Sequence, residues 1–212
     1  MRTPIVRVES RAVVIERDDI DTDQIIPARF LKGVDRTGLG QALFADWRRN
    51  PDGSLRDELP LNRPEAAGCE ILVTGRNFGC GSSREHAVWA LAEAGFRVVV
   101  AASFGDIFRA NALKNGLLPV EVSAEQLVEL HRLLDDDPAR PLTVDLLAGT
   151  LTAPGWDVVP FSIDAFSRRM LLEGTDELGH LLALEPAIKA YEARHPAPVT
   201  TTRPLGDRAG VS

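Results

Sequence analysis

The chain has 212 residues, 44% of them hydrophobic, which is enough for one domain with a core and short appendages. Its formal net charge of −7 argues against a nucleic-acid-binding protein, and no apolar run reaches the length of a membrane span. The first residues lack a signal-peptide pattern, so we expect a soluble, cytoplasmic protein.

The first predicted element is a strand at residues 6–15, followed by a loop with four aspartates. The spacing lacks the glycine and the distal glutamate of a calcium-binding loop. We expect Asp18 and Asp21 to bond nearby backbone, as aspartates in Asx turns do. Asp23 precedes an apolar triplet and a proline, so its position is well defined and it is the better candidate for chemistry.

A basic loop with several glycines follows at residues 28–40. It carries Arg29, Lys32 and Arg36, and a solvated surface loop is the default interpretation of such charges. The segment at residues 50–65 is polar and interrupted by prolines, which is typical of a connection.

The most informative stretch is residues 75–86, Gly-Arg-Asn-Phe-Gly-Cys-Gly-Ser-Ser-Arg-Glu-His. Before it, residues 71–74 form an apolar, β-branched run typical of a buried strand. After it, residues 87–95 show helical spacing that ends at a glycine. The chain therefore runs strand, glycine-rich turn, helix. Three residues fall at the start of this helix, where free amide groups and the helix dipole favour an anion: Ser82, Ser83 and Arg84.

A plain alternative explains the same residues. Ser82 and Glu85 have the spacing of a capping box, which by itself marks only the start of a helix. Three features favour an anion site in addition: two serines and an arginine crowd one turn, the turn is rich in glycine, and no acidic residue occupies the first helical position. Both interpretations remain open on this evidence.

The rest of the chain alternates between predicted strands and helices. Predicted strands lie at residues 97–102 and 117–120, with three short antiparallel ones at 142–147, 150–153 and 156–161. Predicted helices lie at 104–115, capped by Ser103, and at 123–134, 163–172 and 176–194. We expect one domain over residues 1–195 and a disordered tail, rich in proline, threonine and glycine, over residues 196–212.

Two cysteines, Cys69 and Cys80, are too few to hold an iron–sulfur cluster or a structural zinc ion, and their spacing matches no metal motif. His131, His180 and His195 have no partner at ligand spacing and are read as packing or surface residues. The chain on its own is therefore not expected to bind a metal.

Three stretches together resemble the small subunits of 3-isopropylmalate dehydratase, aconitase-superfamily isomerases of leucine biosynthesis. They are Asp-Thr-Asp-Gln-Ile-Ile-Pro at 21–27, the motif at 77–86, and Ser-Phe-Gly-Asp-Ile-Phe at 103–108 with Asn111 and residues 116–119. The motif at 77–86 is very specific. Residues 36–40, 46–48 and 163–166 resemble the bacterial form in particular.

The resemblance implies an α/β fold: a swivelling three-layer β/β/α domain with a mixed sheet, like the aconitase C-terminal domain. It also implies a partner, a large subunit that holds a [4Fe-4S] cluster with one iron open to substrate. Dehydration of a 2-hydroxy diacid and rehydration at the neighbouring carbon is the implied reaction.

The resemblance also implies roles for individual residues. Ser82 is the base that removes a proton from carbon, and Ser83 and Arg84 hold a substrate carboxylate. Asp23 positions catalytic groups. The family's further carboxylate-binding arginine is best matched by Arg36, with Arg29 and Lys32 as rivals, in a loop expected to close over the substrate's side group.

Three other functions are weighed against this one. The small subunit of a citraconate (2-methylmalate) or homoaconitate hydratase would share the motifs. An anion-binding regulatory module would use the same helix start without a partner. A serine hydrolase with Ser82 and His86 is weak, because the two lie one turn apart and the turn lacks the G-x-S-x-G elbow.

Overall fold

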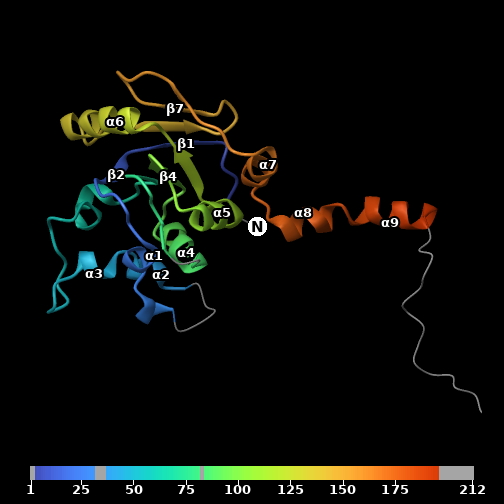
Figure 1. The fold of residues 1–212 in the computed structure, drawn as a ribbon, viewed down its shortest axis with the longest axis horizontal. Coiled ribbons are helices and arrows are strands. Elements are labelled where there is room, and N and C mark those ends of the chain that lie inside the picture. Colours follow the sequence, from blue (N-terminus) through green and yellow to red (C-terminus); the bar gives the residue numbers. More distant parts are fainter. Residues whose placement is uncertain (1–2, 32–36, 82–83, 196–212) are drawn as a thin grey trace, which may run out of the picture. The chain divides into compact units, whose positions relative to one another are not determined.

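A computed structural model gives the fold of the chain and describes residues 3–31, 37–81 and 84–195 (Figure 1). The chain divides into two compact units, residues 1–176 and residues 177–212. The first unit contains both sheets and the candidate site.

A parallel sheet of four strands lies at the centre of the first unit. In spatial order its strands are β2 (Ala12–Ile15), β3 (Ile71–Thr74), β4 (Val98–Ala101) and β5 (Leu118–Glu121). Every residue of β3 and β4 is buried, as expected for continuous apolar runs in a parallel sheet covered on both faces. The strands predicted at 71–74, 97–102 and 117–120 are thus confirmed.

A second sheet is antiparallel, with the order β1 (Arg7–Ser10), β6 (Leu142–Asp145), β7 (Thr150–Thr152) and β8 (Val159–Pro160). The prediction of a single strand over residues 6–15 is wrong, because the chain passes from one sheet to the other at Arg11. Val8 of β1 and Val13 of β2 are both buried, so the apolar pattern does not distinguish the two strands. The expected mixture of parallel and antiparallel strands is present, divided between two sheets.

The helices of the first unit differ in length and place. They are α1 (Thr22–Ile25), α2 (Leu39–Ala42), α3 (Ala45–Arg48), α4 (Glu85–Glu93), α5 (Asp106–Asn115), α6 (Ala124–Asp136) and α7 (Ala165–Glu173), with 3₁₀ turns η1 (Ala28–Phe30), η2 (Pro60–Asn62) and η3 (Pro64–Ala66).

Two hydrophobic cores flank the parallel sheet and define the layers. On one face Leu72 and Val99 pack in a cluster with Val88 of α4. On the other face Val73 and Val100 pack in a cluster with the antiparallel sheet and α6. The order of layers is therefore antiparallel sheet, parallel sheet, helices, which is the predicted β/β/α arrangement.

Helix boundaries follow local capping, with one correction. Ser123 caps α6 as predicted, its hydroxyl accepting from the Gln126 amide at 3.2 Å, and Gly116 ends α5 with φ +81°. Ser103 does not cap α5. Gly105 takes that place, and the Ser103 side chain is used elsewhere, as shown for the site.

The second unit contains α8 (Glu177–Ala183) and α9 (Glu185–Arg194). The single helix predicted at 176–194 is wrong, because Pro186 lies in the first turn of α9, where it lacks an amide hydrogen and marks a new helix start. None of the described residues of this unit is buried. The domain end at residue 195 stays a prediction, and the predicted tail at 196–212 lies outside the described residues.

Candidate active site

Two loops leave the carboxyl ends of β2 and β3 side by side, and backbone hydrogen bonds continue the pairing of the strands. Four bonds of 2.7–3.0 Å join them: Gly75 N to Arg17 O, Asp19 N to Arg76 O, Gly79 N to Ile20 O, and Thr22 N to Cys80 O. The aspartate-rich loop and the glycine-rich turn are therefore one unit of structure. The carboxyl edge of a parallel sheet is where open α/β folds bind their ligands.

A third loop, after β4, supports the glycine-rich turn from its other side. Phe78 N donates to Ser103 O at 3.0 Å, and Gly105 N donates to Phe78 O at 2.9 Å. The buried Phe78 ring meets the rings of Phe104 and Phe108 edge-on, at centroid distances of 6.4 and 5.1 Å. The turn is thus anchored in the core on its inner side.

Gly79 needs to be glycine for two reasons. Its φ is +73°, which L side chains rarely adopt, and a Cβ placed there would lie 2.2 Å from the Phe108 ring. Gly81 has φ +89° but has space around it. The turn thus contains two glycines in the left-handed conformation within three positions.

The structure brings together two predicted site residues that are 61 positions apart. Asp23, on α1, and Arg84, after the glycine-rich turn, form an ion pair through Asp23 Oδ1 and an Arg84 guanidinium nitrogen. The Arg84 side chain is 27% exposed and that of Asp23 is 54% exposed. Asp21 fixes α1 with a capping box, accepting from the Gln24 amide at 2.8 Å.

The start of α4 differs from the prediction. Arg84 is the N-cap residue and Glu85 the first helical residue, so the helix begins later than the predicted cap at Ser82, which itself lies outside the described residues. The extended backbone of Arg84 delays the helix beyond the glycine-rich turn. An acidic residue does occupy the first helical position, which removes one of the three reasons for an anion site given above.

Four further predicted site residues lie outside the described part of the chain: Lys32, Arg36, Ser82 and Ser83. Ser82 and Ser83 are bounded by Gly81 and Arg84, both of which are placed. Their roles stay predictions.

Arg29, the rival of Arg36, is described and is already paired. It donates to Asp46 of α3, and this hydrogen bond holds the pKa of the Asp46 carboxyl below its usual value. A hollow of about 570 Å³ lies beside it, lined also by Arg49 and Arg56. Three guanidinium groups and one carboxylate give this hollow an excess of positive charge, which suits a carboxylate ligand.

The two thiols are both held in the protonated form. Burial raises the pKa of Cys69, and burial followed by the carboxylates of Asp21 and Asp19 raises the pKa of Cys80. Within the described ranges, no three His, Cys, Asp or Glu side chains are grouped to hold a metal ion. Two cysteines are also fewer than the thiolate ligands that a [4Fe-4S] cluster takes.

Sequence reasoning missed a set of residues next to this site. Asp18 was expected to bond nearby backbone, but it accepts from the Arg76 backbone amide at 2.9 Å, 58 positions away. Ser103 was expected to cap a helix, but its hydroxyl accepts from the Asn77 amide at 2.8 Å. The available signal was that all three loops follow neighbouring parallel strands and so meet at one edge.

Comparison with known proteins adds four findings. The aconitase C-terminal domain family matches residues 4–125. The 3-isopropylmalate dehydratase small subunit of Chloroflexus aggregans is 57% identical over 94% of this chain and 98% of its own length. That of Anaeromyxobacter dehalogenans strain 2CP-1 is 54% identical over 89% of this chain and 97% of its own. The crystal structure of 3-isopropylmalate dehydratase from Methanocaldococcus jannaschii has a TM-score of 0.64 and 25% identity, covering 88% of this chain and 99% of that chain.

Proposed function

Since this chain belongs to the aconitase C-terminal domain family, we propose that it is the small subunit of a 3-isopropylmalate dehydratase. The resemblance read from the sequence and the expected fold class are confirmed. The observation that carries the proposal is the Asp23–Arg84 ion pair, which joins two loops that backbone hydrogen bonds hold together at the carboxyl edge of the parallel sheet.

In the proposed reaction, 2-isopropylmalate loses water to give 2-isopropylmaleate, and water returns with the hydroxyl on the neighbouring carbon. When a large subunit holds it, a [4Fe-4S] cluster supplies a Lewis-acidic iron for the hydroxyl group. This chain removes a proton from a carbon of the substrate and binds a substrate carboxylate. With two cysteines it cannot supply the cluster, so it acts with a partner.

Arg84 is the residue we assign to carboxylate binding. Its side chain is about one-quarter exposed and its guanidinium is paired with Asp23, so the group is oriented before substrate arrives. A guanidinium can bind a carboxylate through two parallel hydrogen bonds, which fixes the orientation of the substrate as well as its position. Asp23 is accordingly a positioning residue for Arg84.

Ser82 is the residue we assign to proton abstraction. A serine hydroxyl is a weak base in water, and its alkoxide needs nearby positive charge and a site from which water is excluded. Arg84, two residues on, supplies the charge. The partner subunit, closing over the turn, supplies the exclusion of water.

Reconstitution tests this proposal. The chain is co-expressed with the cluster-bearing large subunit of a bacterial 3-isopropylmalate dehydratase, and the purified brown complex is assayed with 2-isopropylmalate, citraconate and homoaconitate. We expect formation of 3-isopropylmalate by the complex and none by the isolated chain. If the complex converts only citraconate or homoaconitate, that diacid is the substrate in place of 2-isopropylmalate. If the complex converts none of them and the isolated chain binds phosphate, the chain is an anion-binding regulatory module.

The chain is proposed to work in the cytoplasm, where biosynthesis of amino acids takes place. No helix in the ranges 3–31, 37–81 and 84–195 combines the length and apolar character needed to cross a bilayer.

A further inference from the structure

Two residues that are not glycine adopt the left-handed conformation in the paired loops beside the proposed site. Asp19 and Asn77 both have φ +55°. This conformation is unfavourable for L residues, although Asp and Asn tolerate it best, and such residues gather where the surrounding structure holds a functional segment in place. One of the two lies in each loop, at the same level of the pairing.

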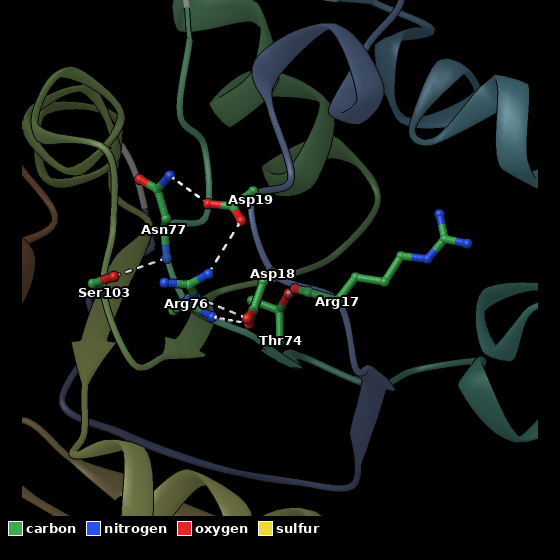
Figure 2. Close-up of polar contacts among 7 residues, drawn as sticks. All are labelled: Arg17, Asp18, Asp19, Thr74, Arg76, Asn77 and Ser103. Atoms are coloured by element: carbon green, nitrogen blue, oxygen red, sulfur yellow. Dashed lines mark hydrogen bonds and ion pairs between the residues drawn. The ribbon is translucent and has the colours of Figure 1, made fainter.

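The two residues are bonded to each other (Figure 2). Asn77 Nδ2 donates to Asp19 Oδ1 at 2.8 Å, and Asp19 N donates to Arg76 O at 2.9 Å. Asn77 N donates to Ser103 Oγ at 2.8 Å, which connects the third loop. Each of these three hydrogen bonds joins groups on different loops, so the contacts fix the loops relative to one another.

Arg76 strengthens the same junction. Its backbone amide and its Nε each donate to Asp18, both at 2.9 Å, and its guanidinium lies 3.6 Å from Asp19 Oδ2. The backbone and side-chain hydrogen bonds from Arg76 lower the pKa of the Asp18 carboxyl. These side chains are more than half exposed, and exposed ion pairs contribute little to global stability. Stability of the fold alone therefore does not account for the arrangement.

The position of the junction gives it a consequence for the site. It lies between the end of the parallel sheet and Gly79, whose amide bonds Ile20, and Cys80, whose carbonyl accepts from Thr22. The two residues of the ion pair lie shortly beyond these bonds, Asp23 one residue after Thr22 and Arg84 four residues after Cys80. A turn with glycines at φ +73° and +89° is not rigid by its own backbone, so contacts outside it must hold it.

We infer that Asp18, Asp19, Arg76, Asn77 and Ser103 form a loop clamp, which holds the glycine-rich turn against α1 and so positions Arg84 for the substrate. The Asp19–Asn77 hydrogen bond is its central contact. These are positioning residues, which act through the turn and do not touch substrate. The role of the loop clamp in catalysis rests on the function proposed above. Its role in holding the three loops together does not depend on that function.

The test exchanges donor and acceptor across the central bond. Asn77→Asp sets two carboxylates against each other, and Asn77→Gly removes the amide while allowing the same backbone conformation. The double variant D19N/N77D restores one hydrogen bond with its direction reversed. Glu9→Gln, which removes an exposed carboxylate from a 2.9 Å pair on the antiparallel sheet, is the matched control.

Two readouts are used on the full chain reconstituted with the large subunit. For N77D and N77G we expect kcat to fall about tenfold to hundredfold, as for a small misplacement of catalytic groups, with the melting temperature and subunit association retained. D19N/N77D recovers most of the lost kcat, and E9Q changes nothing. In hydrogen exchange, the amides of Thr22 and Gly79 lose protection in N77D and regain it in the double variant.

Unchanged kcat and unchanged exchange in N77D would overturn the clamp, as would a double variant that recovers neither. If the wild-type complex does not convert 2-isopropylmalate, the proposed function fails, and the exchange comparison still decides whether the clamp holds the loops.

Discussion

Gly79 lies against the Phe108 ring and has no room for a side chain, whereas Gly53 has the same kind of backbone conformation in open space. Their φ angles are +73° and +86°, and a Cβ at Gly53 would meet no atom within 4 Å. Gly53→Ala is therefore expected to cost about 1–2 kcal/mol, the penalty of a left-handed L residue. Gly79→Ala carries the same penalty and a steric clash of about 1–3 kcal/mol in addition.

Urea unfolding of the isolated chain measures both variants. The difference between them isolates the contact with Phe108, because the backbone term is shared. Equal unfolding free energies for the two alanine variants would show that the turn can move off the ring, and the turn would then not be anchored in the core.

Arg84 is predicted to bind substrate through a planar fork that lysine cannot reproduce. Arg84→Lys keeps the charge but offers the substrate carboxylate one hydrogen bond in place of two parallel ones. We expect KM for 2-isopropylmalate to rise about tenfold to hundredfold, the cost of one charge-assisted hydrogen bond, with a smaller fall in kcat. Arg7→Lys on β1 is the control, and an unchanged KM in Arg84→Lys would remove the carboxylate role.

At the residue scale, the structure describes two of the six predicted site residues, and the roles of all six stay predictions. Asp23 and Arg84 were both expected, and the structure brings them into contact. Asp18 was assigned to local backbone because an aspartate in a loop most often bonds its neighbours. Its partner, Arg76, is 58 positions away, and only the pairing of β2 with β3 brings the two together.

At the scale of elements, apolar runs predicted where the buried strands lie along the chain. They did not predict which of the two sheets each strand belongs to. Residues 6–15 read as one strand, yet β1 pairs antiparallel with β6 and β2 pairs parallel with β3. The pattern of a strand reports which face is buried and not which neighbour it bonds. Likewise, Ser103 is a residue type that often caps helices. Its hydroxyl instead accepts from the Asn77 amide, a tertiary contact that the local sequence does not indicate.

Helix α6 carries a histidine whose titration is expected to affect stability. The His131 side chain is 15% exposed, and among the described residues its Nε2 has no hydrogen-bond partner. Burial lowers the pKa of His131 below its ordinary value of 6.5, against the opposing effect of Glu16, Asp135 and Asp18. The unfolded chain therefore binds the proton more readily, and stability falls as pH drops below about 6.5.

The measurement is the unfolding free energy of the isolated chain in steps from about pH 7 to about pH 5, a range that spans the ordinary histidine pKa. His131→Gln, which cannot take up a proton, flattens the curve. Glu16→Gln removes a carboxylate that favours the charged ring, so it widens the range over which stability is lost. A wild-type curve no steeper than that of His131→Gln would contradict the burial argument.

At the scale of the whole molecule, the first unit is a β/β/α domain with the proposed site on the carboxyl edge of its parallel sheet. Two cysteines cannot hold an iron–sulfur cluster, so the proposed function needs a partner that carries one. The division at residue 176 was not predicted, because residues 176–194 read as a helix of the same domain and periodicity does not report whether a helix joins a core. None of residues 177–195 is buried.

The central claim is that this chain contributes the base, and one comparison tests it most directly. Turnover of 2-isopropylmalate is measured for the wild-type chain, Ser82→Ala and the exposed-loop control Ser54→Ala, each reconstituted with the same large subunit and cluster content. The account predicts wild-type turnover for Ser54→Ala and, for Ser82→Ala, a loss of about a hundredfold or more with the complex intact. Turnover by Ser82→Ala at the wild-type rate would contradict it.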